Sequence, residues 1–132
     1  MGSIESASLE DFKGVWEVNF CGALCMMKNA MPYLRQTKGN VVNVSSVAAI
    51  TPIPCAVPYA VTKAALEHLS RCAALENAPY GVRVNAVRLA LALSSGGGSS
   101  TPVLGFDVAI PDLRTDNTIF SAHDSIPALT SS

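Results

Sequence analysis

The spacing of apolar and polar residues over the first 90 positions predicts two helices and two buried strands. Residues 39–46 and 80–87 are short, valine-containing runs that predict buried strands, and residues 59–77 are rich in Ala and Leu and predict a helix. Ser8 is a suitable N-cap for an earlier helix, because Glu10 and Asp11 place negative charge in its first turn. The apolar residues of that earlier helix recur at helical spacing, at Phe12, Val15, Trp16, Phe20, Leu24 and Met27.

Turn-forming residues separate these elements. Residues 51–58 contain three prolines and must form a loop, because proline lacks an amide donor and has a fixed φ angle. Pro32 is expected to bend or end the first helix, and Lys38 with Gly39 to stop it before the strand. The order strand, loop, helix, strand predicts a βαβ unit with parallel strands, and therefore an α/β fold.

The C-terminal part of the chain differs in kind from the first 90 residues. Residues 94–100 consist only of Ser and Gly, and residues 101–132 show no sustained period of 2 or 3.6. We therefore predict one partial domain over residues 1–90 and a low-complexity or disordered tail over residues 91–132.

Composition excludes two classes of partner. The chain has nine Lys and Arg against ten Asp and Glu, a net charge of −1, and the basic residues are scattered, so we predict no nucleic-acid partner. Its longest apolar stretches are interrupted by Gly, Asn or Lys before they reach the roughly 20 residues that span a membrane. We therefore predict no membrane segment.

The cysteines indicate free thiols rather than a metal site or disulfides. No C-x-x-C spacing is present, and neither histidine lies in a ligand-like motif. Cys21 and Cys25 lie one helical turn apart and could in principle share a metal, but small buried thiols are the interpretation that we adopt. We predict no metal and a reducing, cytoplasmic compartment.

Tyr59 and Lys63 are the strongest chemical signal in the sequence. They lie four residues apart, so they share one face of the predicted helix, and an ammonium beside a phenol makes that phenol a usable acid at neutral pH. Ser46 lies thirteen residues before Tyr59, at the end of the first strand, and Asn19 lies on the first helix. Tyr59 and Lys63 are therefore candidate catalytic residues, and Ser46 and Asn19 are considered with them.

Each candidate has an alternative role. Tyr59 could pack on the proline-rich loop, and Lys63 could pair with Glu67, its neighbour one turn further on. Ser46 could only cap the strand end while Ser45 provides the functional hydroxyl, although the spacing favours Ser46. Asn19 could be a hydrogen-bonded core amide.

Four segments resemble the short-chain dehydrogenase/reductase family. They are residues 16–20 (Trp-Glu-Val-Asn-Phe), 43–46 (Asn-Val-Ser-Ser), 59–66 (Tyr-Ala-Val-Thr-Lys-Ala-Ala-Leu) and 81–87 (Gly-Val-Arg-Val-Asn-Ala-Val). The resemblance runs from about Leu9 to Arg88, and all four segments fall at the family's mutual spacings. It implies a partial Rossmann-like, doubly wound parallel sheet, of which the chain holds only the central helix-strand-helix-strand portion.

The resemblance also implies roles for the four candidates in NAD- or NADP-dependent hydride transfer to or from a small carbonyl or alcohol substrate. Tyr59 would exchange the proton with the substrate oxygen, and Ser46 would bind that oxygen. Lys63 would assist Tyr59, and both would contact the cofactor. Asn19 would hold a water that links Lys63 to solvent.

Two departures from the family pattern bear on function. The chain contains no Thr-Gly-x-x-x-Gly-x-Gly turn for the cofactor pyrophosphate, and Arg88, Leu89 and Ala90 replace a small residue followed by Pro-Gly. We therefore expect an internal fragment of a longer reductase, with weak cofactor binding and impaired activity. The alternative is a non-catalytic interaction or regulatory chain.

The helices near residues 9–31 and 59–77 correspond to those that form the dimer interface in the family. Two parallel strands with helices on one face leave the other face bare, and a core this small rarely exceeds a few kcal/mol of stability. We therefore expect a homo-oligomer that forms through these helices.

Overall fold

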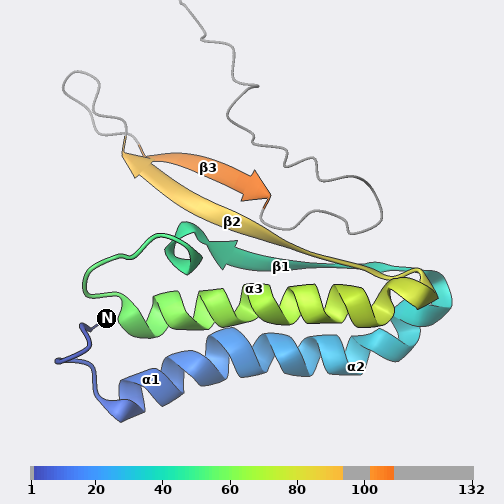
Figure 1. Ribbon diagram of the computed structural model, residues 1–132, viewed down its shortest axis with the longest axis horizontal. Coiled ribbons are helices and arrows are strands. Elements are labelled where there is room, and N and C mark those ends of the chain that lie inside the picture. The colour runs from blue at the N-terminus through green and yellow to red at the C-terminus, as the bar shows by residue number, and fades with distance from the viewer. Residues whose placement is uncertain (1, 94–101, 109–132) are drawn as a thin grey trace, which may run out of the picture.

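The computed structural model describes residues 2–93 and 102–108, and the elements occur in the order helix, strand, helix, strand, strand (Figure 1). The first helical segment comprises α1 (Leu9–Trp16), a π-helical turn η1 (Glu17–Cys21) and α2 (Gly22–Thr37). Strand β1 (Asn40–Ser46) and a short 3-10 turn η2 (Val47–Ala49) follow. Helix α3 (Val57–Asn77), a turn η3 (Ala78–Tyr80) and strands β2 (Arg83–Leu93) and β3 (Pro102–Val108) complete the described part.

The first helical segment begins as predicted. The Ser8 hydroxyl accepts a hydrogen bond from the Asp11 amide at 3.1 Å, and the Asp11 carboxylate accepts one from the Ser8 amide at 3.0 Å, which together form a capping box. The helix continues through Pro32 to Thr37, so this proline does not end it. The stop at Lys38 is confirmed, since Lys38 adopts a left-handed conformation with φ of 52° and the Gly39 amide bonds back to the Leu34 carbonyl.

The sheet confirms the predicted βαβ unit. Strands β1 and β2 pair in parallel, from Asn40 opposite Arg83 to Ser46 opposite Leu89, and α3 makes the connection between them. Helices α2 and α3 lie side by side and cover one face of this sheet (Figure 1). The observed α/β architecture is therefore the central portion of a Rossmann-like fold, as expected.

The structure differs from the sequence prediction in the tail. Strand β2 continues to Leu93, and β3 pairs with it in antiparallel fashion, from Val87 opposite Val108 to Leu93 opposite Pro102. The prediction of an irregular segment is therefore wrong for residues 102–108. Backbone hydrogen bonds to a neighbouring strand can hold a segment whose side chains show no alternation, so periodicity alone missed β3. The rest of the predicted tail, residues 94–101 and 109–132, lies outside the described residues.

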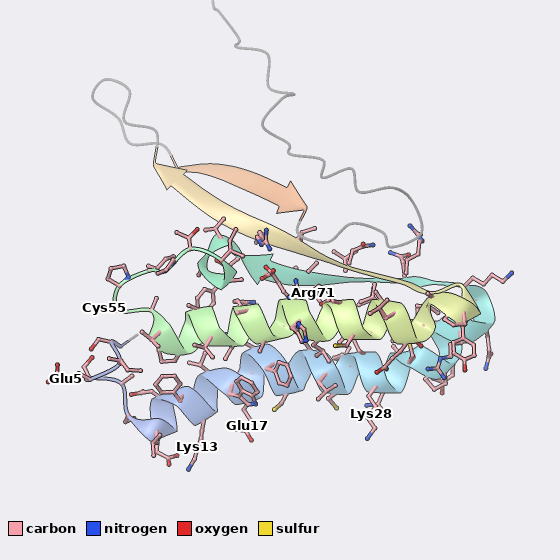
Figure 2. All side chains as sticks on the ribbon, in the orientation of Figure 1. Glu5, Lys13, Glu17, Lys28, Cys55 and Arg71 are labelled. Carbon is pink, nitrogen blue, oxygen red and sulfur yellow. The ribbon has the colours of Figure 1, made fainter. Side chains whose placement is uncertain are left out.

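The core lies between the helices and one face of the sheet. Met27, Ala73, Val82 and Val84 form its buried apolar cluster. Charged side chains such as Lys13, Glu17 and Lys28 project from the opposite, outer side of the first helical segment (Figure 2). No helix in the described part of the chain is long and apolar enough to cross a membrane.

The other face of the sheet is largely uncovered by described residues. Side chains alternate along β1, so Asn43 and Ser45 are buried towards the helices while Val42 and Val44 face the opposite way. These two valines are 51% and 50% exposed. The expectation of one covered and one bare face is confirmed for the described residues.

The capping box allows a test of whether α1 contributes to stability. Replacing Ser8 with Ala should lower the free energy of unfolding by about 1 kcal/mol, because an N-terminal amide of the helix loses its partner. Replacing Gly14 with Ala should raise it by roughly 0.5 to 1 kcal/mol, since an added methyl group meets no atom within 4 Å. Urea unfolding, monitored by circular dichroism, measures the free energy of unfolding of both variants. Unchanged midpoints in both variants would show that α1 unfolds independently of the core.

Candidate active site

Helix α3 positions Tyr59 and Lys63 at the carboxyl end of the strands. Pro58 lies in the first turn of α3, where its fixed φ angle suits a helix start and its missing amide costs nothing. Tyr59 follows it and is 36% exposed. The Lys63 ammonium lies 5.6 Å from the centre of the Tyr59 ring, a distance typical of a cation–π contact. The structure therefore brings the two residues together on one helical face, as the spacing predicted.

Lys63 is held by the backbone of β1. Its Nζ donates a 2.9 Å hydrogen bond to the Val44 carbonyl oxygen, and its stem is half-buried between α3 and the strand. This burial lowers the pKa of Lys63 below its ordinary value, because the ammonium loses part of its hydration. An amine that donates one hydrogen bond to Val44 retains further N–H donors for a ligand.

The alternative in which Lys63 pairs with Glu67 is wrong in this structure. The Glu67 carboxylate instead receives two hydrogen bonds from Arg88, at 2.8 and 2.7 Å, and one from the Ser45 hydroxyl at 2.8 Å. Burial raises the pKa of Glu67, but the hydrogen bonds from Arg88 and Ser45 and the attraction of the Arg88 guanidinium outweigh it and hold this pKa below its usual value. Glu67 is thus a charged carboxylate that is fully engaged away from Lys63.

The two serines at the end of β1 have different surroundings. The Ser45 side chain faces α3 and is committed to Glu67. Ser46 lies on the other side of the strand, and its hydroxyl oxygen accepts a 3.2 Å hydrogen bond from the Ala48 amide, which leaves the hydroxyl hydrogen available to a ligand. This favours Ser46 over Ser45 as the ligand-binding hydroxyl. Among the described hydrogen bonds, none joins Ser46 directly to Tyr59 or Lys63.

Asn19 reaches α3 from the π-helical turn η1. Its Nδ2 donates a 3.3 Å hydrogen bond to the Thr62 hydroxyl, which in turn donates a 2.7 Å bond to the Tyr59 carbonyl oxygen. π-Helical turns often occur at functional sites, where they shift a side chain relative to a regular helix. Asn19 therefore has the partner expected of a core amide and is also joined, through Thr62, to the segment that carries Tyr59 and Lys63.

A cleft of about 400 Å³ opens beside Tyr59. Its walls come from the first residues of the chain, from α1, from η1 and from the start of α3, and they include Val15, Val18, Asn19, Pro58 and Tyr59. Ser46 and Lys63 do not line it. The cleft therefore reaches Tyr59 from the side of Asn19, whereas Lys63 is held on the backbone of β1.

Sequence reasoning missed Thr62 and Arg88. Thr62 could be recognised only from the fold, because its partner Asn19 lies 43 positions earlier. Arg88 gave a weak signal, since a charged residue at the end of a buried valine-rich strand requires a buried counter-charge. Among the described residues, no group of three or more His, Cys, Asp and Glu side chains could hold a metal.

Residues 1–99 match the family described as short chain dehydrogenase. This match covers well over half of the 132 residues. The chain belongs to the short-chain dehydrogenase family. The resemblance inferred from the motifs is thereby confirmed.

Two curated relatives in the short-chain dehydrogenase family illustrate the similarity. L-fucose dehydrogenase of Bos taurus is 39% identical over 83 residues, which cover 63% of this chain and 31% of the relative. The mitochondrial D-beta-hydroxybutyrate dehydrogenase of Mus musculus is 41% identical over 86 residues, which cover 65% of this chain and 25% of the relative. The matched segment thus spans about a quarter to a third of these relatives.

Solved structures of the family agree with the fold. A short-chain dehydrogenase/reductase of unknown function from Caenorhabditis elegans, solved with cofactor, is 31% identical with a TM-score of 0.63, over 67% of this chain and 32% of that one. An oxidoreductase of the family from Brucella ovis, in complex with a partially ordered NAD, is 34% identical with a TM-score of 0.60, over 64% of this chain and 39% of that one.

The described residues fit one end of a nicotinamide cofactor. The N–H donors that Lys63 retains, next to the Tyr59 ring, suit the hydroxyl groups of a nicotinamide ribose. The described helix starts do not suit the pyrophosphate. The Asp11 carboxylate already occupies the N-terminus of α1, and Pro58 removes an amide donor from the first turn of α3.

Proposed function

We propose that this chain carries the proton-transfer residues of an NAD- or NADP-dependent oxidoreductase, which moves a hydride between the nicotinamide and a small carbonyl or alcohol substrate. The pairing of Tyr59 with Lys63 supports this most directly. The Lys63 ammonium lies beside the Tyr59 ring, is anchored on the Val44 carbonyl and has its nearest helical carboxylate, Glu67, engaged elsewhere. An ammonium in that position stabilises the phenolate that remains after proton donation.

Each of the four candidates has a step in this mechanism. The nicotinamide, when bound, supplies the hydride in reduction and accepts it in oxidation. Tyr59 donates a proton to the carbonyl oxygen in reduction and accepts it back in oxidation. Ser46 donates a hydrogen bond to the same oxygen, where negative charge develops. Asn19 holds a water through which Lys63 exchanges protons with solvent.

The relatives indicate the substrate class that we propose. The names of two of them specify L-fucose and D-beta-hydroxybutyrate, both small hydroxylated molecules. We therefore propose a small alcohol or carbonyl compound as substrate. We also propose a cytoplasmic location, because all four cysteines are free thiols. The expectation that these thiols are buried is wrong, since Cys25, Cys55 and Cys72 are exposed and Cys21 is partly exposed.

A homo-oligomer is the assembly that we propose. Large apolar side chains are exposed on the outer helices, and they include Val18, Met26, Tyr33 and Leu75. Burying such side chains against a second copy would remove apolar surface from water. The same surface supports the second candidate function, in which the chain is a non-catalytic interaction or regulatory protein that uses these helices.

Titration of the purified chain with NADH and NADPH, followed by nicotinamide fluorescence, distinguishes the two functions. We expect weak but saturable binding, with Kd on the order of 1 mM, which corresponds to about 4 kcal/mol. Lys63→Met should abolish it, whereas Lys28→Met, the same change on the exposed surface of α2, should not. Non-saturable responses with both nucleotides would reject the enzymatic proposal. Oxidation of L-fucose and D-beta-hydroxybutyrate, measured as nicotinamide absorbance, then tests turnover.

A further inference from the structure

Glu67 is placed where it would normally bind Lys63. The two residues lie four positions apart on α3, and opposite charges at that spacing attract each other on a helix surface. The Lys63 amine is half-buried, and a nearby carboxylate would draw it along the helix towards Glu67 and away from Tyr59. The observed geometry therefore requires something that keeps Glu67 from doing so.

Arg88 meets this requirement. It lies opposite Ser45 in the parallel register of β1 and β2, so it comes from the second strand to the face that α3 covers. Its Nε and Nη2 bind the two carboxylate oxygens of Glu67, at 2.8 and 2.7 Å, and the side chains are 14% and 4% exposed. A two-point bond between a guanidinium and a carboxylate is stronger and more directional than a bond from an ammonium.

We propose that Arg88 is a positioning residue, which engages Glu67 and thereby keeps the Lys63 ammonium on the Val44 carbonyl and beside Tyr59. This inference rests on the proposed function, because it assigns Arg88 to the support of the Tyr59–Lys63 pair. Ser45 also helps to engage Glu67, because its hydroxyl donates the third hydrogen bond to the Glu67 carboxylate. The triad of Ser45, Glu67 and Arg88 joins β1, α3 and β2, and the Ser45 hydroxyl also lies 3.5 Å from the Lys63 carbonyl oxygen.

The other charged groups around Lys63 do not replace this arrangement. Strand β1 and the turn η2 carry no titratable side chain. On α1 and η1, which also pack on α3, the charged residues are exposed, and Asp11 is engaged with Ser8 while Lys13 pairs with Glu10. On α3 itself, Tyr59 and Glu67 flank Lys63, and His68 and Arg71 are exposed, although the Arg71 charge also helps to lower the pKa of Glu67. Glu67 is therefore the carboxylate that Lys63 would reach first.

The experiment measures the titration of the Lys63 amine in the full chain by NMR after ¹³C-methylation of its lysines, with Lys63→Arg to assign the signal. In Arg88→Met, Glu67 loses the guanidinium that hydrogen-bonds to it, so Lys63 should bind Glu67 and titrate at higher pH than in the unsubstituted chain. In the double variant Glu67→Gln/Arg88→Met, no carboxylate remains to attract the amine, and the Lys63 titration should return to its original position. A purely structural role of Arg88 would instead change the Lys63 titration only in variants that lose folded structure, which circular dichroism of the same samples detects.

Two further variants keep the test decisive. Arg88→Lys retains a cation but loses the two-point contact, so it should give a smaller shift in the same direction, and it serves if Arg88→Met does not fold. Arg83→Met makes the same chemical change at an exposed position of β2 and should leave the Lys63 titration unchanged. An unchanged Lys63 signal in Arg88→Met and Arg88→Lys, or a shift that persists in the double variant, would overturn the proposal.

NADH binding measured on the same samples separates this inference from the proposed function. If Lys63 shifts as described while no variant binds NADH, the positioning role of Arg88 stands and the oxidoreductase proposal fails. If the unsubstituted chain binds NADH but the Lys63 titration does not respond to Arg88, only the positioning role fails.

Discussion

Replacing Tyr59 with Phe is expected to lower any carbonyl reduction by the chain by about 10²- to 10⁴-fold, the usual contribution of a positioned general acid. The change removes only the hydroxyl group. The aromatic ring remains beside the Lys63 ammonium, so cofactor binding should persist and the loss should appear in kcat rather than in KM.

Stability should not explain the loss in Tyr59→Phe. The ring is 36% exposed, and none of the described hydrogen bonds involves its hydroxyl group. Tyr33→Phe makes the same change on the exposed surface of α2 and should retain full activity. Steady-state rates and urea midpoints of both variants show whether the loss of activity is accompanied by a loss of stability. Equal turnover in the two variants would remove Tyr59 from the mechanism.

Replacing Arg88 with Met is expected to cost about 3 to 5 kcal/mol of folding free energy, because it leaves the buried Glu67 carboxylate without its counter-charge. This loss is comparable to the whole stability of a small domain. The double variant Glu67→Leu/Arg88→Met should be far less destabilised, since apolar side chains of similar size then fill the site and the Ser45 hydroxyl can bond the Lys63 carbonyl oxygen instead. Urea unfolding at low temperature measures both free energies.

The same pair predicts how stability depends on pH. The folded state holds the pKa of Glu67 below its usual value, so folding is favoured by the ionised carboxylate. This contribution is fully present above the ordinary glutamate pKa of about 4.3 and is lost as the pH falls through the lower pKa of the folded state. The unsubstituted chain should therefore lose stability in this acidic range, and the double variant should lose less. Parallel acid titrations in which the two chains lose stability equally would contradict the assignment.

Local features were predictable from the sequence because their partners are close along the chain. The Ser8 capping box involves residues three apart, and the left-handed stop at Lys38 depends on the residue type that follows it. Tyr59 and Lys63 belong to the same class, since helical geometry alone brings residues four apart to one face. The sequence therefore indicated the central pair before any tertiary contact was known.

Contacts between distant elements were not predictable in this way. Spacing along the helix offered Lys63 as the partner of Glu67, and only the strand register shows that Arg88 binds it instead. The bond from Asn19 to Thr62 depends on how η1 lies on α3. Strand β3 depends on the edge of β2 that lies opposite β1. Each of these features is set by the packing of one element on another, which residue spacing does not encode.

The exposed side of β1 has a consequence for handling the protein. In the described sheet β1 is an outer strand, with a neighbour only at β2. Its seven residues, Asn-Val-Val-Asn-Val-Ser-Ser, include no charge and no proline, the features by which outer strands normally resist self-pairing. Such a composition is typical of an interior strand, which has a neighbouring strand on each edge. In concentrated solution, β1 is thus the segment most open to fibril-like stacking of copies, and a lysine introduced at Val42 would be the natural safeguard against it.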